Sequence, residues 1–180
     1  MERRTLMLGL SGAALPLLVQ ATPRRALAQA GGAASPSATL DAAQHRKATL
    51  RVGSLAKQAS QLALQRASHP AVKQFAGFED AEQTTIAQVL TNTQNPPPAP
   101  LDANEVATLR QLQAAAGPAF DQAYVQGQIT GHQQLLGIQE AFLRGQPGMG
   151  ADAAHVAMLA RTVIQMHLTM LQDLERIVRA

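Results

Sequence analysis

Long stretches of this chain repeat an apolar residue at every third or fourth position, and this spacing constrains the fold more than any other feature. The clearest stretch runs from 152 to 178. Its repeated residues are Val156, Ala160, Val163, His167, Met170, Leu174 and Ile177. Such a period places these side chains on one face of an α-helix that packs against a core. Since no stretch alternates for long like a strand, the sequence predicts an all-α protein.

The same spacing predicts three further long helices, over residues 40–67, 70–93 and 119–144. Their apolar positions are Ala48, Val52, Leu55, Ala59 and Leu62 in the first, Val72, Phe75, Ala76, Ile86, Val89 and Leu90 in the second, and Phe120, Tyr124, Gly127, Gly131, Leu135, Ile138 and Phe142 in the third. Gly127 and Gly131 lie four positions apart on the last of these faces. Because glycine has no side chain, we expect a neighbouring helix to approach closely there.

Proline, glycine and capping residues mark the connections. Residues 95–100 (NPPPAP) form a stiff connector, and 145–150 (GQPGMG) form a loop. Asp102 followed by Glu105 resembles a capping box, which predicts a short extra helix before the third long one. Four long helices with mostly short connections predict an antiparallel four-helix bundle over residues 39–180.

The first 30 residues differ from the rest of the chain in charge. They contain four of the 15 basic residues and one of the 12 acidic residues, so 11 of each remain after residue 30. Arg3 and Arg4 precede an apolar stretch over 6–19, and the small-x-small sequence at 28–30 (AQA) follows. This order is typical of an export signal, which predicts cleavage after Ala30.

The paired arginines followed by 5–7 (TLM) resemble a twin-arginine signal, and Arg24 and Arg25 fit that route. An ordinary secretory signal that carries two arginines is the alternative. Either route predicts a protein of the periplasm or an equivalent extracytoplasmic space, with residues 31–38 as a flexible lead-in. The later residues have no apolar stretch of membrane-spanning length, and their balanced charge gives no reason to expect a nucleic-acid partner. The chain has no cysteine, which excludes disulfides and thiolate metal ligands.

Histidines and glutamates fall on or near the predicted core faces. His167 is in phase with the last helix, His132 lies beside the inner face of the third, and Glu140 follows two turns later. Glu79 and Glu82 lie in the middle of the second helix. Imidazoles and carboxylates from facing helices are common metal ligands inside bundles. The sequence therefore predicts a candidate site for a single transition metal, held by both histidines and one of the three glutamates.

A structural role is the competing interpretation of the same residues. A core histidine often binds a carboxylate or a backbone carbonyl and fixes how two helices pack. A di-iron bundle requires two Glu-x-x-His pairs, but Ile129 and Ile164 stand three positions before the two core histidines, which argues against a di-iron centre. His45 and His69 lie near predicted helix ends, where we expect solvent exposure.

Three segments resemble the domain-of-unknown-function family 4142. They are 67–76 (ASHPAVKQFA), 120–124 (FDQAY) and 128–133 (QITGHQ), and the resemblance extends over about residues 43–178. It implies an exported bacterial protein of ferritin-like four-helix fold, of a kind often described as outer-membrane protein, with no established activity. The polar positions of the family fall on Asp80, Asp121, Tyr124, His132, Glu140 and His167.

This sequence departs from the family pattern at two places. The family commonly has histidine after the aspartate of the second helix, where this chain has Ala81. A glutamate common in the first helix is missing near Val52 and Gly53. Both departures remove a metal-ligating side chain that the resemblance would otherwise imply.

Two hypotheses follow. In the first, this is a non-enzymatic exported bundle with a binding or envelope-stress role, which acts through an envelope protein partner or a homo-oligomer. Asp80, Asp121 and Tyr124 then form a structural polar network with the core histidines. In the second, His132 and His167 hold a metal for storage or a small oxidoreductase activity, and metal stabilises the protein.

Overall fold

The computed structural model describes residues 39–145 and 152–179, which lie within a compact unit of residues 34–180. The predicted export signal, the lead-in at 31–38 and most of the loop at 145–150 lie outside the described residues. The described part contains five helices and no strand: α1 (Ala42–Arg66), α2 (Pro70–Thr91), α3 (Ala103–Ala114), α4 (Gly117–Arg144) and α5 (Asp152–Arg179). The all-α prediction is confirmed, as is the short extra helix before the third long one. None of the described helices combines the length and the hydropathy that crossing a bilayer requires.

Local sequence explains where the helices begin and end. Asp41 starts α1 with a capping box, in which its carboxylate accepts from the backbone N–H of Gln44 at 2.8 Å. Asp102 caps α3 in the same way, and Glu105 completes its capping box as the sequence predicts. Asn92 ends α2 in the left-handed conformation (φ 51°), which asparagine tolerates better than most residues.

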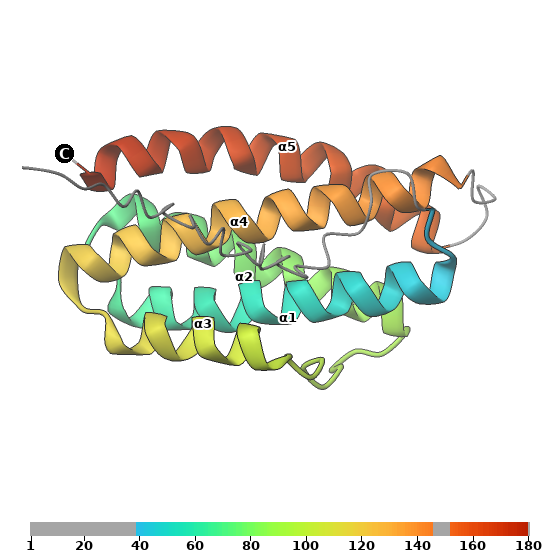
Figure 1. Ribbon diagram of the computed structural model, residues 1–180, viewed down its shortest axis with the longest axis horizontal. Helices are drawn as coiled ribbons and strands as arrows, with labels where there is room; N and C mark the ends of the chain where they lie inside the picture. The colour runs from blue at the N-terminus through green and yellow to red at the C-terminus, as the bar shows by residue number, and fades with distance from the viewer. Residues whose placement is uncertain (1–38, 146–151, 180) are drawn as a thin grey trace, which may run out of the picture. The chain divides into compact units, whose positions relative to one another are not determined.

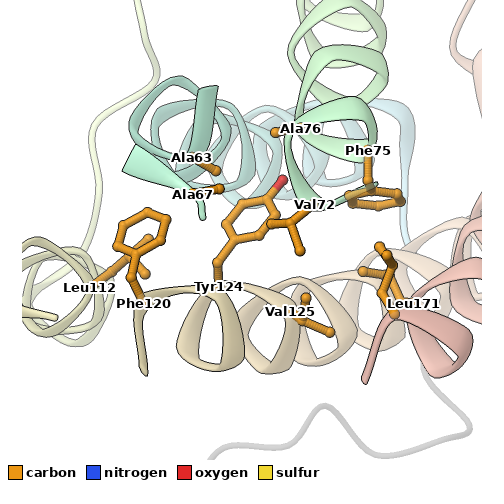
Figure 2. Packing of buried hydrophobic residues seen from close by; sticks show 11 residues of the cluster. Ala63, Ala67, Val72, Phe75, Ala76, Leu112, Phe120, Tyr124, Val125 and Leu171 are labelled. Carbon is orange, nitrogen blue, oxygen red and sulfur yellow. The ribbon is translucent and has the colours of Figure 1, made fainter. Parts of the chain in front are cut away.

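The long helices bury their apolar faces against one another. α1 packs against α2 and α4, while α5 packs against α4 and α2, and α3 lies against α1 and α4 (Figure 1). The largest apolar cluster joins the end of α1 to the start of α2 and the start of α4 (Figure 2). A smaller cluster around Val52, Leu135 and Ile164 occupies a neighbouring layer. Polar side chains lie between these two clusters.

Tyr124 is the largest fully buried side chain of the first cluster. Its ring points from α4 toward α1 and α2 in Figure 2 and stacks parallel to the ring of Phe120. The hydroxyl oxygen lies 2.9 Å from Oγ of Ser60 on α1, so its hydrogen-bonding capacity is used inside the core. Burial raises the pKa of Tyr124 more than these hydrogen bonds lower it, which keeps the phenol neutral.

One sequence prediction about the core is confirmed only in part, and a second is wrong. Among the five residues predicted to form the core face of the first helix, only Val52 is fully buried, while Ala59 and Leu62 are half-buried and pack against the first cluster. The buried face lies one position away and is largely polar or small: His45, Thr49, Val52, Gly53, Ser54, Ala56, Ser60 and Ala63. Apolar periodicity misses such a face because it follows apolar residues alone.

The glycine prediction fails on α4. Gly127 is exposed and Gly131 is half-buried, and a Cβ added to either would meet no atom within 4 Å. The face that enters the core instead includes Gln128, His132 and Gln139. The two glycines therefore do not mark a close approach of helices.

Candidate metal centre

Three ionisable side chains from three helices meet in the polar layer. Glu79 comes from α2, His132 from α4 and His167 from α5, and each is buried. One potential ligand atom from each lies within 4.8 Å of the other two. Apolar residues one turn away, Phe75 before Glu79 and Leu171 after His167, belong to the adjacent core cluster and shield the group from water.

The three atoms form a nearly equilateral triangle. Nε2 of His132 lies 3.2 Å from Nδ1 of His167, and Oε2 of Glu79 lies 3.3 and 3.4 Å from these two nitrogens. Ligands about 2.0–2.1 Å from a tetrahedral zinc ion lie about 3.4 Å from one another. The spacing therefore fits three donors around one ion of this size.

The carboxylate oxygen that faces the histidines has unused capacity. Oε2 of Glu79 is buried and has no hydrogen-bond partner within the described residues. A buried carboxylate oxygen without a partner is costly, so positive charge beside it, from a metal cation or a protonated histidine, is favoured.

A hydrogen bond of the ring nitrogen that faces away from the group fixes the ring orientation of His132. Its Nδ1 lies 2.8 Å from the backbone oxygen of Gln128. Because a carbonyl oxygen only accepts, Nδ1 carries the proton and Nε2 faces the group. Metal-binding histidines usually donate their second ring N–H in this way.

Glu82 adds a fourth group at the edge of the triangle. Its Oε2 lies 3.5 Å from Nδ1 of His167, and its side chain is 19% exposed. It stands one turn after Glu79 on the same helix, so both carboxylates reach the layer from one side. Glu82 is thus the one member of the four that contacts solvent appreciably.

The charges of the site are strongly coupled. Burial favours the neutral acid of Glu79, but the attraction of His132 and His167 outweighs it and lowers the pKa of Glu79 to about 2. Burial also opposes protonation of His132, yet the facing Glu79 carboxylate raises the pKa of this imidazole. Burial and the negative charge of Glu79 raise the pKa of Glu82. The site therefore retains one firmly ionised carboxylate and attracts positive charge.

Of the sequence-predicted metal residues, the structure brings Glu79, His132 and His167 together and leaves Glu140 outside the group. Glu140 lies eight positions after His132, which corresponds to about 12 Å along a helix and a rotation off its face. The predicted structural residues serve separate contacts. Asp80 pairs with Lys57 at 2.7 Å, and Asp121 accepts from the backbone N–H of His69 at 2.8 Å.

Tyr124, in contrast, is connected to the site. Its partner Ser60 accepts from Nε2 of Gln128 at 3.3 Å, and the backbone oxygen of Gln128 holds His132. Position 128 is thus the link between the tyrosine and the imidazole.

Sequence reasoning missed a third buried histidine. His45 has no exposed surface, contrary to the expected exposure, and its Nε2 lies 2.6 Å from Oε1 of Gln139. Its ring stacks on Phe142 with centroids 4.2 Å apart. The helical spacing of His45, Thr49 and Gly53 is the signal that could have revealed this face. His69, predicted to be exposed, is half-buried and caps α2 by accepting from the N–H of Ala71.

The family model for the domain of unknown function DUF4142 matches residues 27–174. The chain belongs to the DUF4142 family. No curated protein and no solved structure matches it. The two places where the sequence resemblance implied a different residue fall differently in space. Ala81 is exposed on α2, whereas Gly53 is buried beside the side chain of Gln83, which binds Glu79.

Proposed function

We propose that this DUF4142 protein binds one divalent first-row transition-metal ion through Glu79, His132 and His167, with Glu82 as the fourth ligand. The observation that carries the proposal is the triangle of donor atoms with edges of 3.2–3.4 Å, one corner of which is a buried carboxylate oxygen that lacks a hydrogen bond in the described part of the chain. Two imidazoles and two carboxylates without sulfur suit zinc, iron, manganese or their neighbours.

Binding rather than catalysis is the proposed role. Catalytic zinc sites usually keep a position open for water or substrate, whereas structural sites are closed by four protein ligands. Glu82 stands where it can close this site with a small movement of its side chain, since its carboxylate already lies 3.5 Å from His167.

Thermal melting of the untagged protein tests this proposal. After chelator treatment, zinc at 100 times its dissociation constant is expected to raise the unfolding free energy by about 2.7 kcal/mol. The His132→Ala/His167→Ala double variant loses this gain, while His155→Ala retains it because that histidine is exposed on α5. Melting of the wild type that zinc leaves unchanged contradicts the proposal.

A structural polar network is the second candidate, and the raised pKa of His132 favours it. A protonated His132 can neutralise Glu79 without any metal. In that case the protein has the binding or envelope-stress role that the sequence suggests, and the site holds α2, α4 and α5 in register. Metal-independent stability together with a titratable His132 in NMR spectra is the result that selects this candidate.

We further propose export to the periplasm or an equivalent space, by the twin-arginine route and with cleavage after Ala30. The basis is the order of charged, apolar and small residues in positions 1–30. Mass spectrometry of the exported protein is expected to find Gly31 as its first residue. Arg3→Lys/Arg4→Lys should trap the precursor in the cytoplasm, and undiminished export of this variant would favour the general secretory route.

For the fold, we propose an antiparallel four-helix bundle of ferritin-like type. It is supported by the N–H of Leu40, before α1, which donates to the oxygen of Ala141 near the end of α4. At the other end, Asp121 near the start of α4 accepts from the backbone that follows α1. Spin labels on cysteines introduced at Gln122 and Gln65 should lie close, and labels at Gln122 and Gln44 far apart.

A further inference from the structure

Gly53 of α1 leaves room for a side chain of the neighbouring helix. A Cβ built on Gly53 would lie 2.3 Å from Oε1 of Gln83 and 3.3 Å from its Cδ. No real side chain tolerates the shorter distance, so the present position of Gln83 requires glycine at 53. The helical glycines Gly127 and Gly137 of α4 differ, because a Cβ on either meets nothing within 4 Å.

The other end of the same amide contacts the candidate metal ligand. Nε2 of Gln83 donates to Oε1 of Glu79 at 3.0 Å, and Gln83 itself is only 4% exposed. The carboxylate can only accept, so the NH2 group must face Glu79 and the amide oxygen must face Gly53. The contact of the amide oxygen with Gly53 therefore fixes the position from which the NH2 group of Gln83 donates to the carboxylate of Glu79.

This bond determines which oxygen of Glu79 faces the histidines. Oε1 is occupied by the amide of Gln83, and Oε2 is left 3.3 Å from His132 and 3.4 Å from His167. Without the amide, both oxygens would be buried without a hydrogen bond in the described structure, and the carboxylate could turn.

We propose that Gln83, seated over Gly53, is a positioning residue that aims Oε2 of Glu79 at the bound metal. The inference rests on the proposed metal-binding function. It also gives a reason for glycine at position 53: the missing Cβ admits an amide that reaches the metal-binding carboxylate from α2.

The surroundings allow Gln83 to be displaced without unfolding the protein. Gln83 and Gly53 both line a groove of about 310 Å³ between α1, α2 and the prolines at 96–98. A methyl group at position 53 can push the flexible end of Gln83 into this groove. The Gly53→Ala variant should therefore fold, and its effect should appear at the metal.

The test compares zinc affinity, measured by chelator competition, and the visible spectrum of bound cobalt in five proteins. They are the wild type, Gly53→Ala, Gln83→Ala, the Gly53→Ala/Gln83→Ala double variant and the control Gly127→Ala. Loss of a group that orients a metal ligand typically weakens affinity about 10–100-fold. We expect this loss and an altered cobalt spectrum for Gly53→Ala and Gln83→Ala, and wild-type behaviour for Gly127→Ala. The double variant should be no weaker than Gln83→Ala, since both changes remove the same interaction.

Two results would overturn the inference, and they differ in what else they reject. If the wild type binds zinc and the first two variants match its affinity and cobalt spectrum, Gln83 only fills space, while the proposed function stands. If the wild type binds neither metal, the proposed function fails and the inference fails with it.

Discussion

Two regions of this protein bury histidine, and they give the ring nitrogens different partners. In the first, His132 and His167 face the carboxylate of Glu79. In the second, His45 lies between the amide of Gln139 and the ring of Phe142. Burial is nearly complete in both regions, with 0–4% of each of these histidines exposed.

The partner, rather than the burial, determines the charge. Burial lowers the pKa of His45, and the hydrogen bond to the neutral amide of Gln139 compensates only in part. The Glu79 carboxylate reverses this outcome for His132 and raises its pKa. The first region can hold a proton or a metal cation, whereas the second keeps a neutral ring that packs and forms hydrogen bonds.

Removing the partner of the histidines in each region should have the largest effect on the unfolding free energy, and it tests the comparison most directly. Since the pKa of Glu79 falls from 4.5 to about 2, its interactions stabilise the fold by about 3 kcal/mol at neutral pH. Glu79→Gln should lose an amount of that order, and Gln139→Leu about 1 kcal/mol, which is typical of one hydrogen bond. Urea unfolding in the presence of chelator measures both, and equal losses would contradict the distinction.

The two regions should also respond to pH with opposite signs. His45 has a folded-state pKa below its unfolded value of 6.5, so it costs stability as the pH falls through 6.5 toward that lower pKa. His132 has a raised pKa, so its contribution is complete below pH 6.5 and is lost as the pH rises through the folded value. Unfolding free energies measured from pH 5 to 8.5 should show a weaker acid-side loss in His45→Gln and a weaker alkaline-side loss in His132→Gln. If both variants changed the pH dependence of the unfolding free energy in the same way, the predicted difference in sign would be contradicted.

The smallest effect is expected for a carboxylate next to the first region that does not face it. Asp80 follows Glu79 in sequence but pairs with Lys57, and the side chains of this pair are each 29% exposed. Partly exposed ion pairs contribute about 0–1 kcal/mol. Asp80→Asn should therefore lower the unfolding free energy by less than 1 kcal/mol and leave zinc affinity unchanged. A large drop in affinity would place Asp80 in the site.

The helices could be predicted from sequence because their signals are local. Spacing of apolar residues identified the four long helices, and the Asp102–Glu105 pair identified α3. The face of α1 was assigned incorrectly because His45, Thr49 and Ser60 enter the core through partners on α4 that lie 64 to 94 positions away. Such pairings depend on the packing of helices, so the spacing of His45, Thr49 and Gly53 can indicate a buried face but cannot identify the partners that bring it into the core.

The candidate site was predictable in its residue types and not in its geometry. His167 lies in phase with its helix, and Glu79 stands in the middle of a buried face, so both could be selected. To select Glu79 rather than Glu140 as the partner of the histidines, one must know how α2 and α4 are shifted relative to each other along their axes. The role of Gln83 requires the contact with Gly53 across two helices, which no spacing within one helix reveals.

The metal content of the protein tests the central claim most directly. The untagged protein, exported with its own signal and purified without chelator, is analysed for iron, zinc, copper and manganese beside His45→Gln and His132→Ala/His167→Ala. We expect about one equivalent of a single metal in the wild type and in His45→Gln, and none in the double variant. A wild type without metal, or equal metal in all three proteins, would contradict the distinction between the two histidine regions.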